Sequence, residues 1–169
     1  MPRLFVAVWP PPEVVERIAA LPRPAVPGLR WTAPEQWHVT LRFLGRVDEA
    51  APVDEALSYV VGPAVDVVAG PSVGRFDHRV LHVPVDGLAP LAAAVVAATS
   101  GFGEPPEDRP FAGHLTLARV RRGARVDLRA LAGTRIAGQW RVDEVTLVES
   151  RLGGAGARYE IAARYPLAG

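Results

Sequence analysis

Apolar and polar residues alternate along several short stretches of the chain, and a period of two predicts strands that bury one face. Between these stretches, apolar residues recur three or four positions apart, which predicts helices. The predicted strands are residues 4–9, 29–32, 37–45, 65–69 with 73–76 beyond a break, 79–85, 111–120, 140–149 and 158–165. One helix is predicted directly after the prolines at 10–12. Three more are predicted over residues 48–60, 88–100 and 126–131, and Asp48 is the expected N-cap of the helix at 48–60.

The order of these elements predicts an α+β fold with largely antiparallel sheets. Residues 101–110 are rich in Gly, Pro and acidic side chains, which indicates a surface loop without a share in the core. The sequence LGGAGA at 152–157 predicts a flexible hairpin loop between the last two strands. No stretch has the composition of an interdomain linker, so we expect residues 1–169 to form a single domain.

One short pattern occurs twice, as HVTL from His38 and as HLTL from His114, 76 residues apart. On a strand, residues two apart point to the same face. His38 and Thr40 therefore share one face, and His114 and Thr116 share another. The repeat suggests two pseudo-symmetric lobes, and if these lobes face each other, two imidazoles and two hydroxyls meet in one cleft.

The net charge is only +1, so no field of the whole molecule attracts nucleic acid. All 19 basic residues are Arg, which suits phosphate but also fits a compositional bias. The chain has no Cys, which excludes disulfides and thiolate chemistry and suits a cytoplasmic protein. The N-terminal apolar run ends at the prolines and does not resemble a signal peptide, and no run approaches the roughly 20 residues of a membrane span.

Two histidines and two threonines can do phosphoryl chemistry without a metal or cofactor. One neutral imidazole can take a proton from water while a charged one protonates a leaving oxygen. The Thr hydroxyls can hold the phosphate oxygens in place. A metal site fits poorly, because each motif supplies one nitrogen and contains no carboxylate.

The paired motifs resemble the 2H phosphoesterase superfamily, and WTAPEQWHVTLRFLG and FAGHLTLARV resemble the two signatures of its RNA 2′,3′-cyclic phosphodiesterases, also called 2′-5′ RNA ligases. The resemblance implies a bilobal fold with helices outside and the active cleft between the lobes. It implies hydrolysis of RNA 2′,3′-cyclic phosphate ends to 2′-phosphates, with reverse 2′-5′ ligation. His38 is then the acid, His114 the base, and Thr40 and Thr116 bind the phosphate, although the sequence is symmetric with respect to acid and base. Arg119 matches the Arg of the second signature.

Other assignments are less specific. Strand alternation places Arg42 on the face of His38, as a second phosphate-binding candidate. His82 reads as an ordinary strand histidine, and Trp31 and Trp37 as core residues in preference to base-stacking ones. The arginines of residues 121–129 suit either an RNA backbone or solvent. Two alternatives stay open: a phosphodiesterase for small cyclic nucleotide or ADP-ribose phosphates, and a weakly active RNA-binding module. We expect a monomer with no cofactor, no metal and no membrane partner.

Overall fold

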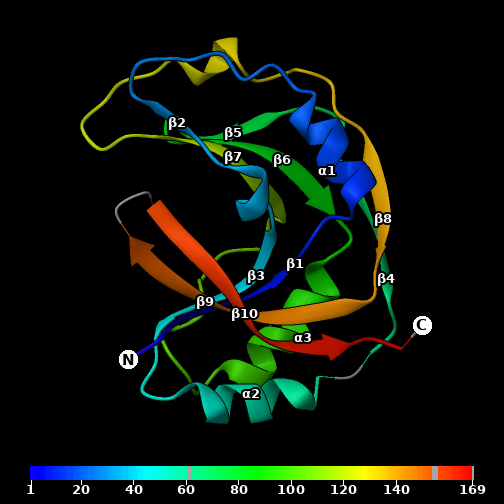
Figure 1. Cartoon of the computed structure of the whole chain (residues 1–169). Helices are drawn as coiled ribbons and strands as arrows, with labels where there is room; N and C mark the ends of the chain where they lie inside the picture. The colour runs from blue at the N-terminus through cyan, green and yellow to red at the C-terminus, as the bar shows by residue number, and fades with distance from the viewer. Residues whose placement is uncertain (61, 154–155, 169) are drawn as a thin grey trace.

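The computed structural model of the chain describes residues 1–60, 62–153 and 156–168. Within them, ten strands form one curled sheet in which neighbouring strands are antiparallel (Figure 1). The strands are β1 (Arg3–Val8), β2 (Leu29–Trp31), β3 (Val39–Arg46), β4 (Val65–Ala69), β5 (Gly74–Phe76), β6 (Val80–Asp86), β7 (His114–Val120), β8 (Gly138–Val142), β9 (Glu144–Gly153) and β10 (Gly156–Pro166). The helices are α1 (Pro12–Ala19), α2 (Ala50–Ser58) and α3 (Ala89–Thr99), with short 3-10 turns η1 (Pro34–Gln36) and η2 (Leu128–Ala130). The predicted α+β class is confirmed.

The sheet consists of two similar halves. The first half has the order β10-β9-β1-β3, and the second continues as β7-β6-β4-β8. β2 is added to β7 and β5 to β6. The central strands β3 and β7 are joined by one residue pair, Val39 with Leu115, and we call this junction the seam. In each half a helix links two neighbouring antiparallel strands, since α1 lies between β1 and β3 in the chain and α3 between β6 and β7.

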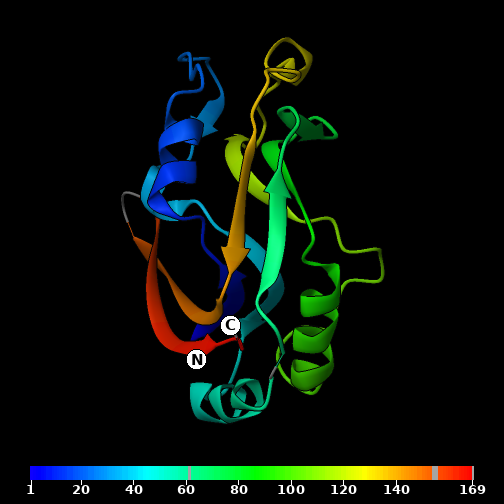
Figure 2. The same ribbon diagram turned by 90° about the vertical axis from the view of Figure 1, so that its right-hand side faces the viewer.

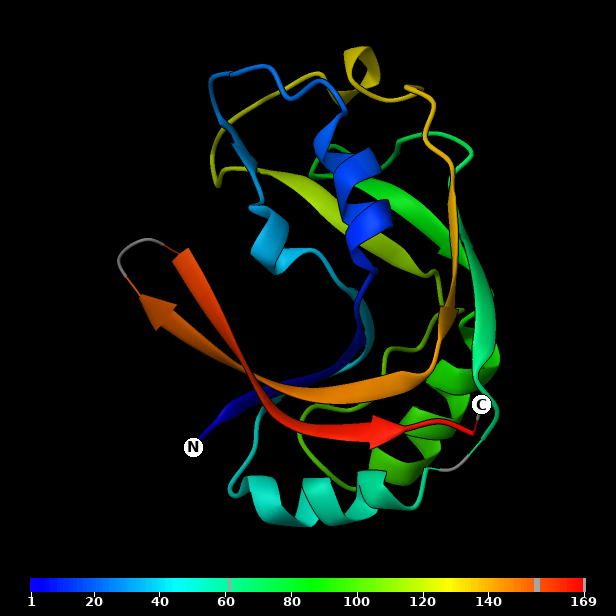
Figure 3. The same cartoon turned by 45° about the vertical axis from the view of Figure 1, so that its right-hand side comes forward.

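The helices tie the two halves together, because each packs across the junction. α1 leaves β1 of the first half but packs against β8 of the second, where its Val14 lies next to Gly138. α3 leaves β6 of the second half but packs against β3 of the first. α2 lies against α3 and the end of β10, and in Figures 2 and 3 α1 lies in the upper part of the molecule and α3 in the lower part.

One large apolar core contains buried residues from both halves. A smaller cluster of Phe5, Ala7 and Val148 lies on the other face of the sheet, where Trp9 and Tyr159 pack against it. β1 is therefore covered on both faces, which explains its continuous apolar sequence. Among the described residues, no helix is long and apolar enough to cross a membrane.

Several predicted boundaries differ from the structure. α2 begins at Ala50, with Glu49 as its N-cap and no side-chain bond, so Asp48 does not cap it. The predicted strand at 140–149 is two strands, because the sheet turns at Asp143. The predicted helix at 126–131 is only the turn η2. In the predicted loop at 152–157, strand pairing continues to Gly153 and Gly156, and residues 154–155 lie outside the described residues.

The loop at 101–110 lies at the surface as predicted, and it is also attached to the core, which its composition did not indicate. Phe102 packs against the main core, and the backbone N–H of Glu104 donates to the carbonyl of Leu44 at 2.8 Å. Gly103 has φ +62°, and a Cβ there would clash with the Leu44 carbonyl. Only glycine meets both conditions without strain.

The seam gives the first testable prediction. Leu115 is 1% exposed and Leu152 is 78% exposed. Leu115→Ala should lower the free energy of unfolding by about 2–5 kcal/mol, because a buried cavity replaces the side chain. Leu152→Ala, the matched control, should change it by less than about 0.5 kcal/mol. Urea unfolding of both variants measures the difference, and equal stabilities would contradict the described seam.

Candidate functional site

The seam brings the two HxT motifs onto one face of the sheet, which we call the histidine face. Extending the seam register by one residue on each side places His38 opposite Thr116 and Thr40 opposite His114. All four side chains are half-buried, whereas the seam pair beneath them is fully buried. The two histidines are thus diagonal neighbours, and in an antiparallel ladder such neighbours lie about 7–8 Å apart.

Each imidazole is held by the same hydrogen bond. His38 Nδ1 lies 2.7 Å from the carbonyl oxygen of Gln36, and His114 Nδ1 lies 2.8 Å from that of Ala112. Both carbonyls belong to the residue two positions before the histidine. Because a carbonyl only accepts, Nδ1 carries the proton in both rings, and the neutral ring has its lone pair on Nε2. In His38 this Nε2 is 3.0 Å from the hydroxyl of Thr40.

Aromatic rings surround His38. The centroids of Phe5, Trp9 and Tyr159 lie 4.8, 5.3 and 5.3 Å from the centroid of its imidazole. Burial among them lowers the pKa of His38 to about 4, against the opposing effect of the Gln36 hydrogen bond. The positive charges of Arg119 and His114 lower it further. His38 is therefore neutral at pH 7 in the free protein.

His114 has a more polar neighbourhood. Burial lowers its pKa, the hydrogen bond to Ala112 opposes this, and the charges of Arg119 and Arg109 lower it again. The carboxylate of Glu107 acts in the opposite direction. Both Arg109 and Glu107 belong to the loop at 101–110, which the sequence did not connect with the site. The shift is smaller than that of His38, so the two imidazoles differ in charge preference although their motifs are alike.

Phe76 and His82 form the side wall next to His114. The Phe76 ring lies 4.7 Å from His114 and stacks on His82 at 4.0 Å. His82 is 6% exposed, lies 5.5 Å from His114, and has an Nδ1 without a hydrogen-bond partner within the described chain. Burial and the nearby His114 lower its pKa to about 4. A cavity of about 230 Å³, lined in part by Phe76, His82 and Phe111, opens here.

Arg119 reaches the histidine face because of a β-bulge. Thr116 and Ala118 pair with consecutive residues of β6, so Leu117 is an extra residue in β7. Leu117 and Ala118 are both buried, and Arg119 is exposed on the side of Thr116. Strict alternation from Thr116 would have sent Arg119 to the opposite face. Its charge acts on His38, His114 and Tyr159, which places the guanidinium near all three.

The same bulge occurs in β3 and overturns the expectation for Arg42. Thr40 and Arg42 pair with consecutive residues of β1, so Leu41 is the extra residue. Leu41 and Arg42 are each 4% exposed, and Phe43 returns to the surface at 39%. In the two motifs, Arg42 therefore corresponds to Ala118 and Phe43 to Arg119. Alternation had placed Arg42 beside His38, but the bulge turns it into the interior.

Arg42 holds the loop at 101–110. Its guanidinium donates to the carbonyl of Phe43 at 3.0 Å, to that of Phe102 at 3.1 Å and to that of Glu104 at 2.7 Å. Burial lowers its pKa, and the charge of Glu104 opposes this. Arg42 therefore has a structural role. Of the two candidate arginines, Arg119 is the one on the histidine face.

The tryptophans behave largely as predicted. Trp37 is 1% exposed and its indole N–H donates to the Thr32 hydroxyl, so it is a core residue. Trp31 is half-buried and donates to the Pro24 carbonyl. The rings around His38 were missed, because Phe5 and Trp9 come from β1 and the residue after it, and Tyr159 comes from β10. Only the strand order β10-β9-β1-β3 brings these segments into the same half of the sheet as β3. Within the described residues, no three His, Asp or Glu side chains gather as a metal site would need.

Comparison with known proteins identifies the class. A sequence model of the 2′-5′ RNA ligase superfamily matches residues 10–154. A relative from Archaeoglobus fulgidus, named RNA 2′,3′-cyclic phosphodiesterase, is 34% identical over 131 residues, which cover 71% of this chain and 73% of the relative. The crystal structure of TT0787 of Thermus thermophilus is 28% identical with a TM-score of 0.78, covering 99% of this chain and 98% of the other. Escherichia coli LigT in apo form is 27% identical with a TM-score of 0.73, at 99% and 98% coverage.

These matches, together with the antiparallel halves and the paired histidines, define a 2H phosphoesterase, which is a hydrolase. The chain belongs to the 2′-5′ RNA ligase superfamily.

The contrast between the two arginines gives the second prediction. Arg42→Ala should lower the free energy of unfolding by about 2–3 kcal/mol, because three carbonyls lose a charged donor in a buried place. Arg119→Ala removes an exposed side chain and should cost less than about 0.5 kcal/mol. Urea unfolding compares the two, and a larger loss for Arg119→Ala would refute this division.

Proposed function

We propose that this enzyme opens the 2′,3′-cyclic phosphate at the end of an RNA and leaves a 2′-phosphomonoester. The observation that carries the proposal is the seam register, which, extended by one residue on each side, puts both imidazoles and both Thr hydroxyls on one face of the sheet. The name of the archaeal relative supports the same substrate class. Chemically, the cyclic diester is strained, so acid–base help and positioning suffice for its hydrolysis.

The proposed step is a single in-line displacement. His114 Nε2 takes a proton from water while the water oxygen forms a bond to phosphorus. The bond from phosphorus to the 3′-oxygen breaks, and the protonated His38 gives its Nε2 proton to that oxygen. The product keeps the 2′-phosphate and gains a free 3′-hydroxyl. General acid and base groups each contribute about 10²–10⁴-fold to reactions of this kind.

Thr40, Thr116 and Arg119 bind the phosphate in this proposal. The hydroxyls are diagonal neighbours across the seam and can donate to the two non-bridging oxygens. The positive charge of the Arg119 guanidinium stabilises those oxygens more strongly as negative charge builds up on them during the reaction. The same groups serve a ligation in which a 5′-hydroxyl replaces water as the nucleophile, the 3′-oxygen leaves and a 2′-5′ linkage forms. Water is in large excess, so hydrolysis is the dominant direction.

The low pKa of His38 sets a condition on its use as the acid. The free enzyme holds His38 neutral, and His114 protonates more readily. An anionic phosphate beside both rings favours their charged forms and raises both pKa values. The negative charge of the substrate therefore favours the protonated form of His38, and the productive form of the complex is the one in which His38 carries the proton and His114 is neutral.

The two-histidine step leads to the third prediction. With an RNA ending in 2′,3′-cyclic phosphate and EDTA present, the wild-type enzyme should form a 2′-phosphate, and His38→Ala and His114→Ala should each lose about 10²-fold or more in kcat. Tyr59→Ala, a change of an exposed ring, is the control and should keep full activity. Product phosphate position is read by NMR or by phosphatase sensitivity, and near-normal turnover in either histidine variant would refute the mechanism.

A second substrate separates the acid from the base. A phosphodiester whose leaving group departs without protonation, such as a nitrophenyl ester, needs no acid. His38→Ala should recover most of its loss on that substrate, whereas His114→Ala should not. The opposite pattern would exchange the two roles and leave the two-histidine mechanism in place.

The fourth prediction concerns pH. The reaction needs one neutral and one charged imidazole, so kcat/KM should follow a bell between the pKa values of the free enzyme. His38 has a pKa of about 4 and the pKa of His114 lies below its ordinary 6.5, so the maximum should lie on the acid side of neutrality. The profile of kcat should peak at higher pH, because bound phosphate raises both values.

Arg119→Gln tests the cause of that profile. Its positive charge lowers the pKa of both histidines, so removing it should move the kcat/KM maximum upward in pH as well as reduce the rate. A matched profile for Arg141→Gln, far from the seam on β8, serves as the control. An unshifted maximum in Arg119→Gln would show that the guanidinium does not act on the histidines.

A further inference from the structure

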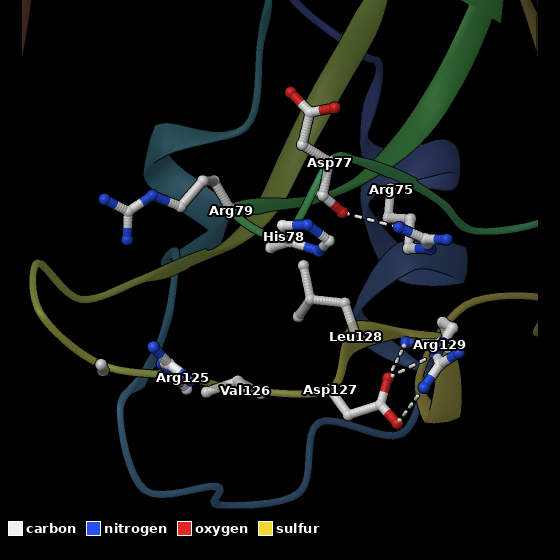
Figure 4. A pocket seen from close by; sticks show the side chains of 10 residues that line it. Arg75, Asp77, His78, Arg79, Arg125, Val126, Asp127, Leu128 and Arg129 are labelled. Carbon is white, nitrogen blue, oxygen red and sulfur yellow. Dashed lines mark hydrogen bonds and ion pairs between the residues drawn. The ribbon is translucent and has the colours of Figure 1, made fainter.

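A second cavity, of about 820 Å³, lies beyond the histidine face. Its walls are the β5–β6 hairpin turn on one side and residues 124–129, which lead into η2, on the other (Figure 4). Its volume is in the range of ligand pockets, roughly 300–1,000 Å³. Four arginines line it, two from each wall, and we call it the arginine pocket: Arg75 and Arg79 from the hairpin, Arg125 and Arg129 from the segment.

The charges of the arginine pocket are only partly balanced from within. Arg129 is paired with Asp127 at 3.0 Å, and Arg75 donates to the backbone carbonyl of Asp77. Arg79 and Arg125 form no ion pair or side-chain hydrogen bond within the part of the chain that the structure describes. Figure 4 shows the carboxylate of Asp77 turned away from Leu128 and the pocket interior. Two guanidinium groups on opposite walls are thus available to an anion.

The arginine pocket is continuous with the proposed catalytic site through two elements. Phe76, whose ring lies 4.7 Å from His114, stands in the chain between two residues that line the pocket. On β7, Arg119 is paired with Val80, and the next residue, Val120, donates its N–H to the carbonyl of Arg79 at 2.8 Å. The pocket therefore begins about four strand residues beyond Thr116, or about 13 Å at the usual strand rise.

We propose that the arginine pocket binds the sugar–phosphate backbone of the RNA 5′ to its cyclic end, and so makes the enzyme prefer oligonucleotides to mononucleotides. The proposal rests on the proposed function. A single nucleotide held at the histidines does not span this distance, whereas the phosphates of the preceding nucleotides do. Guanidinium groups bind phosphate through two parallel hydrogen bonds, and Arg119 continues the positive path from the seam to the pocket.

Two substrates and two double variants test the proposal. The substrates are a 2′,3′-cyclic mononucleotide and an RNA oligonucleotide that ends in 2′,3′-cyclic phosphate. The test variant is Arg79→Ala with Arg125→Ala. The control is Arg17→Ala with Arg141→Ala, which removes the same charge from exposed positions on α1 and β8. Steady-state kinetics are measured for both substrates at several salt concentrations.

The wild-type enzyme should have a lower KM for the oligonucleotide than for the mononucleotide. In the test variant, the oligonucleotide KM should rise by roughly tenfold. The slope of log KM against log salt concentration should fall by about 1.4, which is about 0.7 for each lost phosphate contact to a single strand. Its kcat/KM for the mononucleotide should stay within about twofold, since that substrate does not reach the pocket. The control variant should match the wild type on both substrates.

The outcomes are distinct. If the wild type cleaves both substrates with equal KM, or if the test and control variants behave alike, the pocket does not bind RNA and the proposed function stands. If kcat/KM of the test variant falls equally for the mononucleotide and the oligonucleotide, the arginines support the fold or the catalytic site, and the pocket proposal is refuted. If the wild type cleaves neither substrate, the proposed function and the pocket proposal both fall.

Discussion

The site depends on one pairing constraint, the seam between Val39 and Leu115. Both side chains are buried, so the register that pairs them determines which face of each central strand is exposed to solvent. A slip of one residue would bury the histidines and expose the seam pair, at the cost of unpaired polar groups in the core. Helix packing supports the seam, because α1 and α3 each pack against the half that they do not belong to in the chain and so hold the halves containing β3 and β7 together.

Matching bulges decide which arginine reaches the histidines. Alternation alone predicts the faces of His38, Thr40, His114 and Thr116, and the structure agrees, because these residues precede the bulge in each strand. Alternation fails for Arg42, because this residue lies beyond the bulge in β3. The sequence contains no local signal for the extra residue, since a bulge is defined by the partner strand. The position of Arg119 was expected only from family resemblance, and the bulge at Leu117 is its physical reason.

Much of the fold could be predicted from the sequence, since periodicity located the strands and the main helices. Loops were harder, because composition says little about what a loop contacts. The segment at 101–110 looked solvent-exposed, yet Arg42 binds its carbonyls and Glu107 and Arg109 act on His114. The rings around His38 could likewise not be predicted, because only the order β10-β9-β1-β3 puts β1 and β10 into the same half of the sheet as β3.

The two halves are alike in backbone but not in the surroundings of their histidines. The position that holds Arg119 in one half holds Phe43 in the other, and three aromatic rings surround His38 where charged groups act on His114. Two identical imidazoles on identical hydrogen bonds thus acquire different pKa values from their environments alone. Because the pKa of His38, the proposed acid, is about 4, the proposed reaction depends on the bound phosphate to keep a proton on that ring. The duplicated frame therefore places the two imidazoles symmetrically about the seam, and the unlike walls give each ring a different environment.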